Sequence, residues 1–493
     1  MTARRTPVRG LADLNPLTRV VATPWSRIVR GVGLGQHPSG FDPCEADRIR
    51  WSFARLRDRV DDAHPYTRFA AELAGTALDV TQGDPLRAGY VAGRVDAVAA
   101  TARGLTTPYE RVTATSILLT AVATLGLTAD PHVAARVGPL VRETLAAVDE
   151  IRPDQIADEN QGRHGDYERV AAWTALLLAL AHFEPHELPV VPDDAQVAAA
   201  LASIGRVPSP FFRGRGGSTL LSAVAVLGGS AAVEEHARAT LAWLDRSHPA
   251  ALQPAFPSAM SPAFVTAYPL LTMLNAIAVS GHLELLDVGR DRLAQATDLM
   301  AAMAPVERTH MALYHVVALD NLGRLDDRLP DLDGFVEDVV GRWRSIDPGR
   351  DYFLYGISYA YLAQLAYVTG RSDLVTDTMV ERMVTPFARL GATPAGRANR
   401  PYPFAYVLNV LGELGLAERL YEPRPAYGGA SAFEHVVDHL SPGGRAEGAR
   451  LYMLDHALVS WALRQRPAGS PVPGRIGRHR LVGVHGEPVL GST

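Results

Sequence analysis

The stretch that decides the fold is RDYFLYGISYAYLAQLAYVTGRSDLV, residues 350–375, in which one helix is expected to end at a glycine just before another begins. No proline interrupts residues 351–367, and tyrosines and leucines recur at helical spacing on both faces. A helix that is apolar on both faces is typical of burial on two sides. Gly370 is suited to the left-handed conformation that ends a helix, and Ser372 is the expected N-cap of the next helix.

Similar glycine joints recur along the chain. Gly281 is followed after 42 residues by Gly323, after another 47 by Gly370, and after another 45 by Gly415. Earlier joints are expected near residues 126 and 229. A period of this length with two helices per unit indicates a helical repeat. Because a single hairpin cannot bury its apolar face alone, we expect neighbouring hairpins to stack.

The predicted fold class is all-α, built from α/α hairpins of about 45 residues. Two arrangements satisfy it, an open solenoid or a closed α/α toroid with one helix of each pair inside and one outside. The first helices of the pairs carry more aromatic and polar residues than an apolar interface between stacked helices requires. Because an inner ring of helices around a cavity explains this mixture, we favour the toroid. The predicted organisation is an irregular arm at 1–41, the repeat domain at 42–466 and an irregular tail at 467–493.

Further helices are expected on both sides of this region, and no segment has a strand period long enough to form a sheet. A polar connection at 149–166 and a glycine-rich approach at 208–217, PSPFFRGRGG, separate some of the helices. Long connections in compact folds are often functional, although a plain surface loop explains the first equally well. The expected helices are 42–59, 64–80, 86–102, 108–125, 131–148, 167–181, 193–204, 218–227, 231–244 and 447–466, with hairpins between 264 and about 420.

Composition narrows the function classes. The 493 residues carry a formal charge of −5, and 47% of them are hydrophobic, which fits a globular protein with a large core. Without clustered basic helices, this charge argues against nucleic acid as a partner. The sequence contains no run of ~20 apolar residues, so no membrane span is predicted. The single Cys44 excludes an intramolecular disulfide and fits the cytoplasm. All basic residues are arginine, which we interpret as the usage of a GC-rich bacterial genome.

Arginines mark the entries into the first helices of the pairs. Three Glu-Arg doublets stand there, at 110–111, 168–169 and 307–308. In a ring these entries share one rim, where guanidinium groups and helix N-termini both favour anions. Helix capping and pairing between neighbouring units explain the doublets without a ligand. The arginines predicted to bind substrate are Arg213, Arg215, Arg350 and Arg400.

Aromatic residues and histidines follow about one helical turn further along. Aromatic faces stabilise cations and stack on rings, so these side chains are the expected cavity wall, although each taken singly also suits a core. The predicted substrate-binding aromatics are Tyr268, Tyr314, Tyr355 and Tyr406, and the acid–base candidates are Asp166, Glu168, His310 and Tyr352.

The densest acidic cluster is RLDDRLPDLDG, which contains Asp326, Asp327, Asp331 and Asp333. It resembles the aspartate-rich motifs of class I terpene synthases, which bind magnesium and diphosphate. Pro330 interrupts the helix that such a motif needs, and loop solvation or helix capping is an alternative role. We therefore predict no metal ligands and no cofactor, with magnesium a candidate only if the substrate is a diphosphate.

Three functions remain open. The first is an enzyme for an anionic, partly apolar small molecule, for example a non-standard terpene cyclase or isomerase that holds a carbocation between aromatic walls. The second is a lyase of acidic sugars, by analogy of fold and composition with toroidal polysaccharide lyases. The third is an open helical scaffold that binds a protein, in which the rim arginines pair with glutamates of neighbouring units. The lyase would use Asn160, His164, Tyr167 and Arg169.

Overall fold

The computed structural model describes most of the central part of the chain, and the protein is mostly helical there. The predicted arm at 1–41, the tail at 467–493 and the helices at 42–59, 64–80 and 447–466 lie outside the described residues. The residues that the structure describes are 90–124, 127–152, 156–158, 163–181, 183, 187–252, 260–346, 352–385, 387, 407, 411, 416–420, 422–432 and 434–435.

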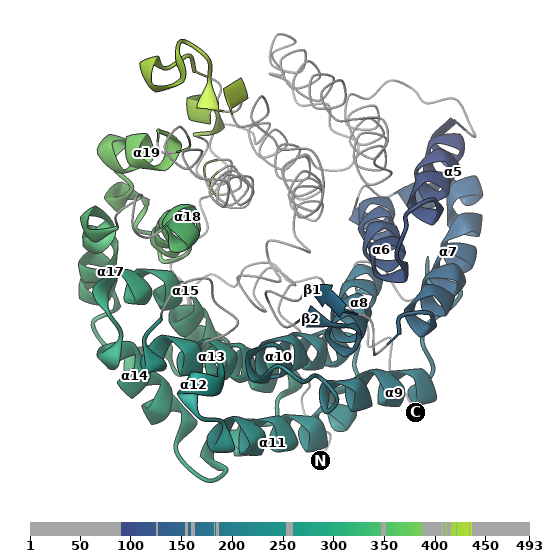
Figure 1. Cartoon of the computed structure of the whole chain (residues 1–493), viewed down its shortest axis with the longest axis horizontal. Helices are drawn as coiled ribbons and strands as arrows, with labels where there is room; N and C mark the ends of the chain where they lie inside the picture. The colour runs from purple at the N-terminus through teal and green to yellow at the C-terminus, as the bar shows by residue number, and fades with distance from the viewer. Residues whose placement is uncertain are drawn as a thin grey trace.

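The described helices form an arc of two layers (Figure 1). Each helix of the inner row packs against the next one of that row. The inner row consists of α6 (Pro108–Thr124), α8 (Gly165–Leu180), α10 (Pro210–Val226), α13 (Pro262–Ser280), α15 (Pro305–Asn321) and α18 (Tyr352–Val368). The outer layer consists of α7 (Pro131–Asp149), α9 (Asp194–Ile204), α11 (Ser230–Arg246), α14 (Arg292–Ala302), α17 (Leu332–Gly341) and α19 (Asp377–Val384).

Shorter or flanking elements complete this arrangement. Helix α5 (Tyr90–Arg103) packs against α6 and α7 at one end of the arc. The connections also contain α12 (Pro249–Leu252), α16 (Leu325–Arg328) and the 3-10 turns η1 (Leu127–Ala129), η5 (Leu283–Asp287), η6 (Arg342–Ser345), η7 (Ser372–Leu374), η8 (Ala417–Leu420) and η9 (Pro425–Tyr427).

Burial differs between the two layers in the way the sequence predicts. In the inner row, every residue of 309–316 in α15 and of 358–366 in α18 is buried, so these helices are covered on all sides. The outer helix α7 is amphipathic, with Val133, Val137 and Val141 buried and the opposite side exposed. Helix α13 is long and apolar enough to cross a membrane by composition, and 78% of its most apolar window is buried inside the protein.

Glycines end several inner helices as expected. Gly281, Gly323 and Gly370 all have positive φ, between 66° and 79°. After α18, the Arg371 N–H donates to the Ala366 carbonyl at 2.7 Å, which closes the last turn. The expected N-cap at Ser372 is wrong, because residues 372–374 form the 3-10 turn η7. Thr376 caps α19 instead, by accepting a hydrogen bond from the Met379 N–H at 3.3 Å.

The polar connection at 149–166 contains a short two-stranded hairpin, which the sequence did not predict. Strands β1 (Ile156–Asp158) and β2 (Arg163–His164) pair antiparallel, with Ile156 opposite His164. Strand β2 leads directly into Gly165, the first residue of α8, and both strands pack on that helix. The connection is therefore ordered where it meets the inner row.

The start of α10 corrects the interpretation of PSPFFRGRGG as a loop. The helix begins at Pro210, so that all three glycines lie inside it. A Cβ atom at Gly214 would lie 2.7 Å from the Pro269 Cβ of α13, and one at Gly217 would lie 2.7 Å from the Ile204 Cγ2 of α9. A Cβ at Gly216 would meet the ring of Tyr167 on α8 at 2.9 Å. The glycines thus allow three neighbouring helices to approach α10 closely, which compensates for their low helix propensity.

Replacing Gly214 with alanine should destabilise the protein by about 1–3 kcal/mol, because the proline ring of α13 cannot swing away from the added methyl group. Gly93 of α5 is a matched control, since a Cβ there meets nothing within 4 Å. Gly93→Ala should stabilise by up to about 1 kcal/mol through helix propensity. Urea unfolding of the two variants measures both values. Equal effects of the two substitutions would show that α10 is not closely packed.

His315 of α15 faces the outer layer, where its ring lies edge-on to Phe335 of α17 at 6.4 Å between centroids. The side chain is buried, and neither ring nitrogen has a hydrogen-bond partner among the described residues. Burial lowers the pKa of His315 to about 4. The folded protein therefore holds this histidine neutral, and the stability that depends on it is lost as the pH falls from about 6.5 towards 4.

His315→Leu should consequently stabilise the protein more at pH 5 than at pH 8, with a difference of about 2 kcal/mol, because the unfolded chain no longer gains a proton at that position. Phe335→Leu, which alters the ring that contacts His315 and changes no titratable group, is the control and should change stability equally at both pH values. The measurement is denaturant unfolding of each variant and the unmodified protein at the two pH values. Parallel pH profiles for His315→Leu and the unmodified protein would contradict the burial argument.

Candidate functional site

A continuous band of aromatic rings runs along the inner row from α8 to α18. Tyr167 contacts Phe212 at 4.6 Å between ring centroids, and Phe212 contacts Phe211 at 5.5 Å. Phe211 contacts Tyr268 at 5.4 Å, and Tyr268 contacts Tyr314 at 5.2 Å. These distances are those of favourable aromatic pairs. We call the set Tyr167, Phe211, Phe212, Phe264, Tyr268, His310, Tyr314 and Tyr361 the aromatic band.

Three tyrosine hydroxyls of the aromatic band form a buried chain. The Tyr268 and Tyr314 hydroxyls are 3.0 Å apart, and the Tyr314 and Tyr361 hydroxyls are 3.2 Å apart. Each comes from a different inner helix, α13, α15 and α18 in turn. Burial is the main cause that raises the pKa of Tyr268, so its hydroxyl stays protonated. Because each hydroxyl can both donate and accept, the chain can pass a proton between three helices.

His310 lies beside this chain. Its ring centroid is 4.9 Å from that of Tyr361 and 6.0 Å from that of Tyr268, and its Nδ1 is 3.4 Å from the Ser358 Oγ. Burial, and after it the charge of Arg215, lower the pKa of His310 to about 3. A neutral imidazole donates through one ring nitrogen and accepts through the other, so His310 can take part in a proton transfer as an acceptor.

Arg213 and Arg215, two of the four arginines predicted to bind substrate, lie against different helices. The Arg215 guanidinium carbon is 5.7 Å from the ring centroid of Tyr268, within the aromatic band. The Arg213 guanidinium carbon lies 4.6 Å from the ring centroid of Trp243 on α11. Burial, and after it the charge of Arg246, lower the pKa of Arg213. Of the predicted pair, Arg215 is thus the cation that the structure places at the band.

The carboxylates predicted as acids or bases both lie in the first turn of α8. Asp166 is mostly buried and accepts a hydrogen bond from the Arg206 Nε at 3.1 Å. Glu168 is buried as well. At a helix N-terminus, both carboxylates interact favourably with the helix dipole. The ion pair between Asp166 and Arg206 explains the position of that carboxylate without a ligand.

The Glu-Arg doublets hold helix ends together. Glu307 accepts hydrogen bonds from the Ser261 N–H at 2.6 Å and from the Ala304 N–H at 3.1 Å, which joins the starts of α13 and α15. Arg308 donates to the Met300 and Ala301 carbonyls at the end of α14. In the first doublet, Glu110 caps α6 by accepting from the Thr107 N–H, and Arg111 pairs with Glu150. In the second, Arg169 donates to the Asp149 carbonyl at the end of α7.

Several predicted site residues cannot be placed. The backbones of Tyr352 and Tyr355 belong to α18, but their side chains lie outside the described set, as does the side chain of His164. Arg350, Arg400, Tyr406 and Asn160 lie outside the described residues altogether. Of the set predicted for a lyase, Tyr167 belongs to the aromatic band, whereas Arg169 points to the end of α7.

The acidic cluster at 326–333 has structural contacts. Asp331 caps α17 by accepting from the Gly334 N–H at 2.9 Å, and Asp327 pairs with Arg324 at 3.4 Å. Among the described residues, none of the four aspartates belongs to a group of converging metal ligands.

Sequence analysis missed Tyr361 and Ser358 as members of the site. Residue type alone does not separate Tyr361 from Tyr359, which lies on another face of α18 and donates to the Trp343 carbonyl at 3.0 Å. Tyr268, Tyr314 and Tyr361 are separated by 46 and then 47 residues, close to the 42, 47 and 45 residues between the glycine joints. This similarity is the sequence signal that places the three tyrosines at equivalent positions of successive units.

Comparison of the chain with protein-family models, with curated proteins and with solved structures gives no match. The function must be argued from the aromatic band itself.

Proposed function

We propose that the protein is an enzyme in which stacked α/α hairpins close into a toroid and the aromatic band belongs to the wall of its reaction cavity. The substrate class is an anionic, partly apolar small molecule, and the reaction is an isomerisation or cyclisation in which a proton moves. A prenyl diphosphate is the concrete candidate, because aromatic faces stabilise the carbocations that such molecules form.

The observation that carries the proposal is the buried chain of hydroxyls beside His310. Stable packing of inner helices needs only apolar side chains, whereas three buried hydroxyls and a buried imidazole must each find polar partners. Here the three hydroxyls find one another across three helices, and the imidazole has the Ser358 Oγ 3.4 Å from its Nδ1. Titratable groups with a strongly shifted pKa that gather in one place are typical of catalytic sites.

The roles follow from the chemistry of each group. Burial and the charge of Arg215 hold His310 neutral and make it a weak base, which suffices to accept a proton from a strongly acidic carbocation. The tyrosine chain would return a proton to another carbon of the same substrate, since each hydroxyl donates as its neighbour accepts. The proton that His310 took would then pass to the tyrosinate so formed, which restores both groups. Arg215 would attract the anionic end, as guanidinium groups do for carboxylate and phosphate.

The test compares two tyrosines of α18 that differ in the face they occupy. Tyr361→Phe removes the last hydroxyl of the chain, and Tyr359→Phe removes an equally buried hydroxyl that bonds to the Trp343 carbonyl. Each should lower the free energy of unfolding by about 1 kcal/mol, because each loses one hydrogen bond. Only Tyr361→Phe should also slow turnover of prenyl diphosphates, by about 10²-fold or more.

The measurement is product formation by the full chain with and without magnesium, together with urea unfolding of both variants. Absence of product and of binding by calorimetry for the unmodified protein would remove the prenyl diphosphate version. If a substrate is found and the two variants turn it over equally, the hydroxyl chain has no part in the reaction.

A second candidate, a scaffold that binds a protein, is favoured by one observation. Arg111 and Arg308 pair with groups of neighbouring helices, as expected if the rim is structural. The two candidates differ in closure, because a scaffold is an open superhelix with a concave groove, while the enzyme requires contact between the first and last hairpins.

A further inference from the structure

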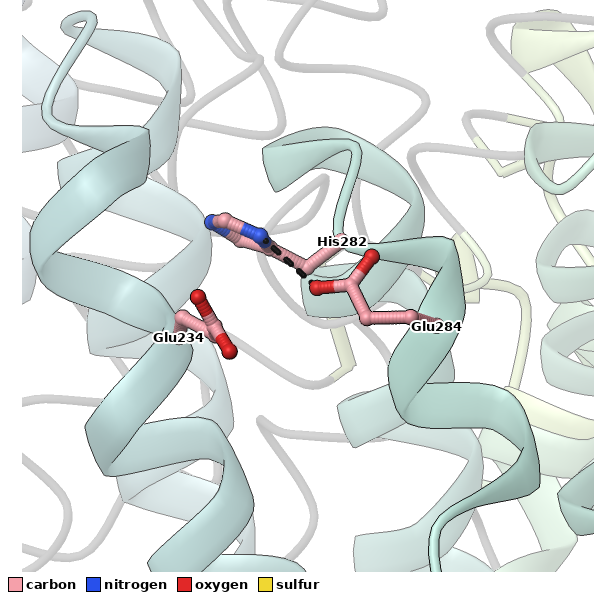
Figure 2. Close-up of side chains that lie close together, drawn as sticks. All are labelled: Glu234, His282 and Glu284. Atoms are coloured by element: carbon pink, nitrogen blue, oxygen red, sulfur yellow. Dashed lines mark hydrogen bonds and ion pairs between the residues drawn. The ribbon is translucent and has the colours of Figure 1, made fainter.

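A second cluster of chemically active side chains lies at the other end of α13 from the aromatic band. Glu234 belongs to α11, His282 follows the glycine that ends α13, and Glu284 belongs to η5 (Figure 2). His282 comes 14 residues after Tyr268, which corresponds to about 20 Å along a helix axis. The cluster is therefore separate from the aromatic band.

The three side chains converge on one point. One ring nitrogen of His282 and one carboxylate oxygen of each glutamate all lie within 4.8 Å of one another. The His282 Nδ1 is 3.1 Å from a Glu284 oxygen, shown as a dashed line in Figure 2. Ligands around a tetrahedral zinc ion lie about 2.0–2.1 Å from the ion and therefore about 3.4 Å from each other. The three ligand atoms are thus within about 1.4 Å of the required spacing, and both glutamate side chains are exposed enough to adjust.

Charge makes this convergence informative. Two carboxylates that approach each other repel unless a cation lies between or beside them. Glu234 is paired with Arg238 through one oxygen at 2.9 Å. Within the described part of the chain, Glu284 is paired with no arginine, and the His282 Nδ1 lies beside it. Among the described residues, the two carboxylates therefore have Arg238 alone as an arginine partner.

The backbone at the cluster is fixed by the joint after α13. Gly281 adopts φ 79°, its N–H donates to the Ile277 carbonyl at 2.9 Å, and the Leu285 N–H donates to the His282 carbonyl at 3.0 Å. Helix α11 packs against both α13 and η5. The ligand-bearing segments are therefore placed before any ion binds, which lowers the entropic cost of binding.

We propose that Glu234, His282 and Glu284 bind one divalent first-row transition-metal ion, with zinc as the probe, and that water completes its coordination. An imidazole with two carboxylates suits zinc better than magnesium, which prefers oxygen ligands and keeps its waters. The bound ion joins α11 to the α13–η5 joint, and it thereby stabilises the contact between two adjacent hairpins. This site is independent of the proposed reaction.

The experiment is calorimetric titration of the metal-free full chain with zinc chloride, paired with thermal unfolding. We expect one equivalent of zinc to bind and to raise Tm, because a ligand that binds only the folded state stabilises it. His282→Ala and Glu284→Gln should each weaken binding at least tenfold and abolish the rise in Tm. Magnesium chloride at the same concentration should give neither effect.

Glu235→Gln and His236→Ala are the matched controls, since both residues lie on α11 beside Glu234 but outside the cluster. They should bind zinc like the unmodified protein. Circular dichroism verifies that every variant is folded, and Glu284 is exposed enough that its replacement leaves the core intact. Absence of zinc binding, or equal binding by His282→Ala, Glu284→Gln and the controls, would overturn the proposal and leave an adventitious ion only.

Discussion

The structure depends on the close, side-by-side packing of its inner helices. Helices α15 and α18 are covered on all sides along most of their length, so a polar side chain there needs a partner. The separation of neighbouring inner helices is set by the smallest residues at each contact. Helix α10 shows this most clearly, because Gly214, Gly216 and Gly217 each give room to a different neighbour. The aromatic band becomes continuous at this point, where Phe211 and Phe212 of α10 join Tyr167 to Tyr268.

Close packing also decides which polar groups meet. Residues one period apart lie side by side on successive inner helices, so that identical groups come into contact. Tyr268 and Tyr314 share a hydrogen bond, and the Asn321 side chain donates to the Asn275 side chain at 2.9 Å. Ser261 and Glu307 are joined across the same interval. These lateral contacts support the proposed repeat, and they satisfy polar groups that would otherwise be costly to bury.

Helix positions could largely be predicted from the sequence, because periodicity and capping residues are local signals. The bounds of α6, α7 and α9 differ from the predicted ones by at most one residue at each end. The left-handed glycines at 281, 323 and 370 are also where the sequence places them. The start of α10 could not be predicted from the sequence. Glycine occurs both in loops and at close contacts between helices, and only the neighbouring helix distinguishes the two cases.

The candidate site was predicted only in part, for a related reason. Tyr268, His310 and Tyr314 were recognised by residue type and spacing within single helices. Tyr361 and Ser358 join them through contacts between helices, and the separation of Arg213 from Arg215 follows from the helical path of α10, which turns the two side chains to different neighbours. The cluster of Glu234, His282 and Glu284 brings together residues about 50 positions apart, and no local pattern announces it.

The proposed reaction requires that the arc close into a toroid. Only an enclosed cavity would let the aromatic band line a reaction site, because otherwise the band is an interface between packed helices. The direct measurement is the distance between a spin label on Cys44, in the helix predicted at 42–59, and one on a cysteine introduced at Ala457, in the helix predicted at 447–466. If the ring closes, pulsed electron paramagnetic resonance should give a narrow distribution at about 15–30 Å, since neighbouring packed helices lie about 10 Å apart and the labels extend beyond them. A broad distribution at distances comparable with the full width of the protein would show an open superhelix and contradict the account.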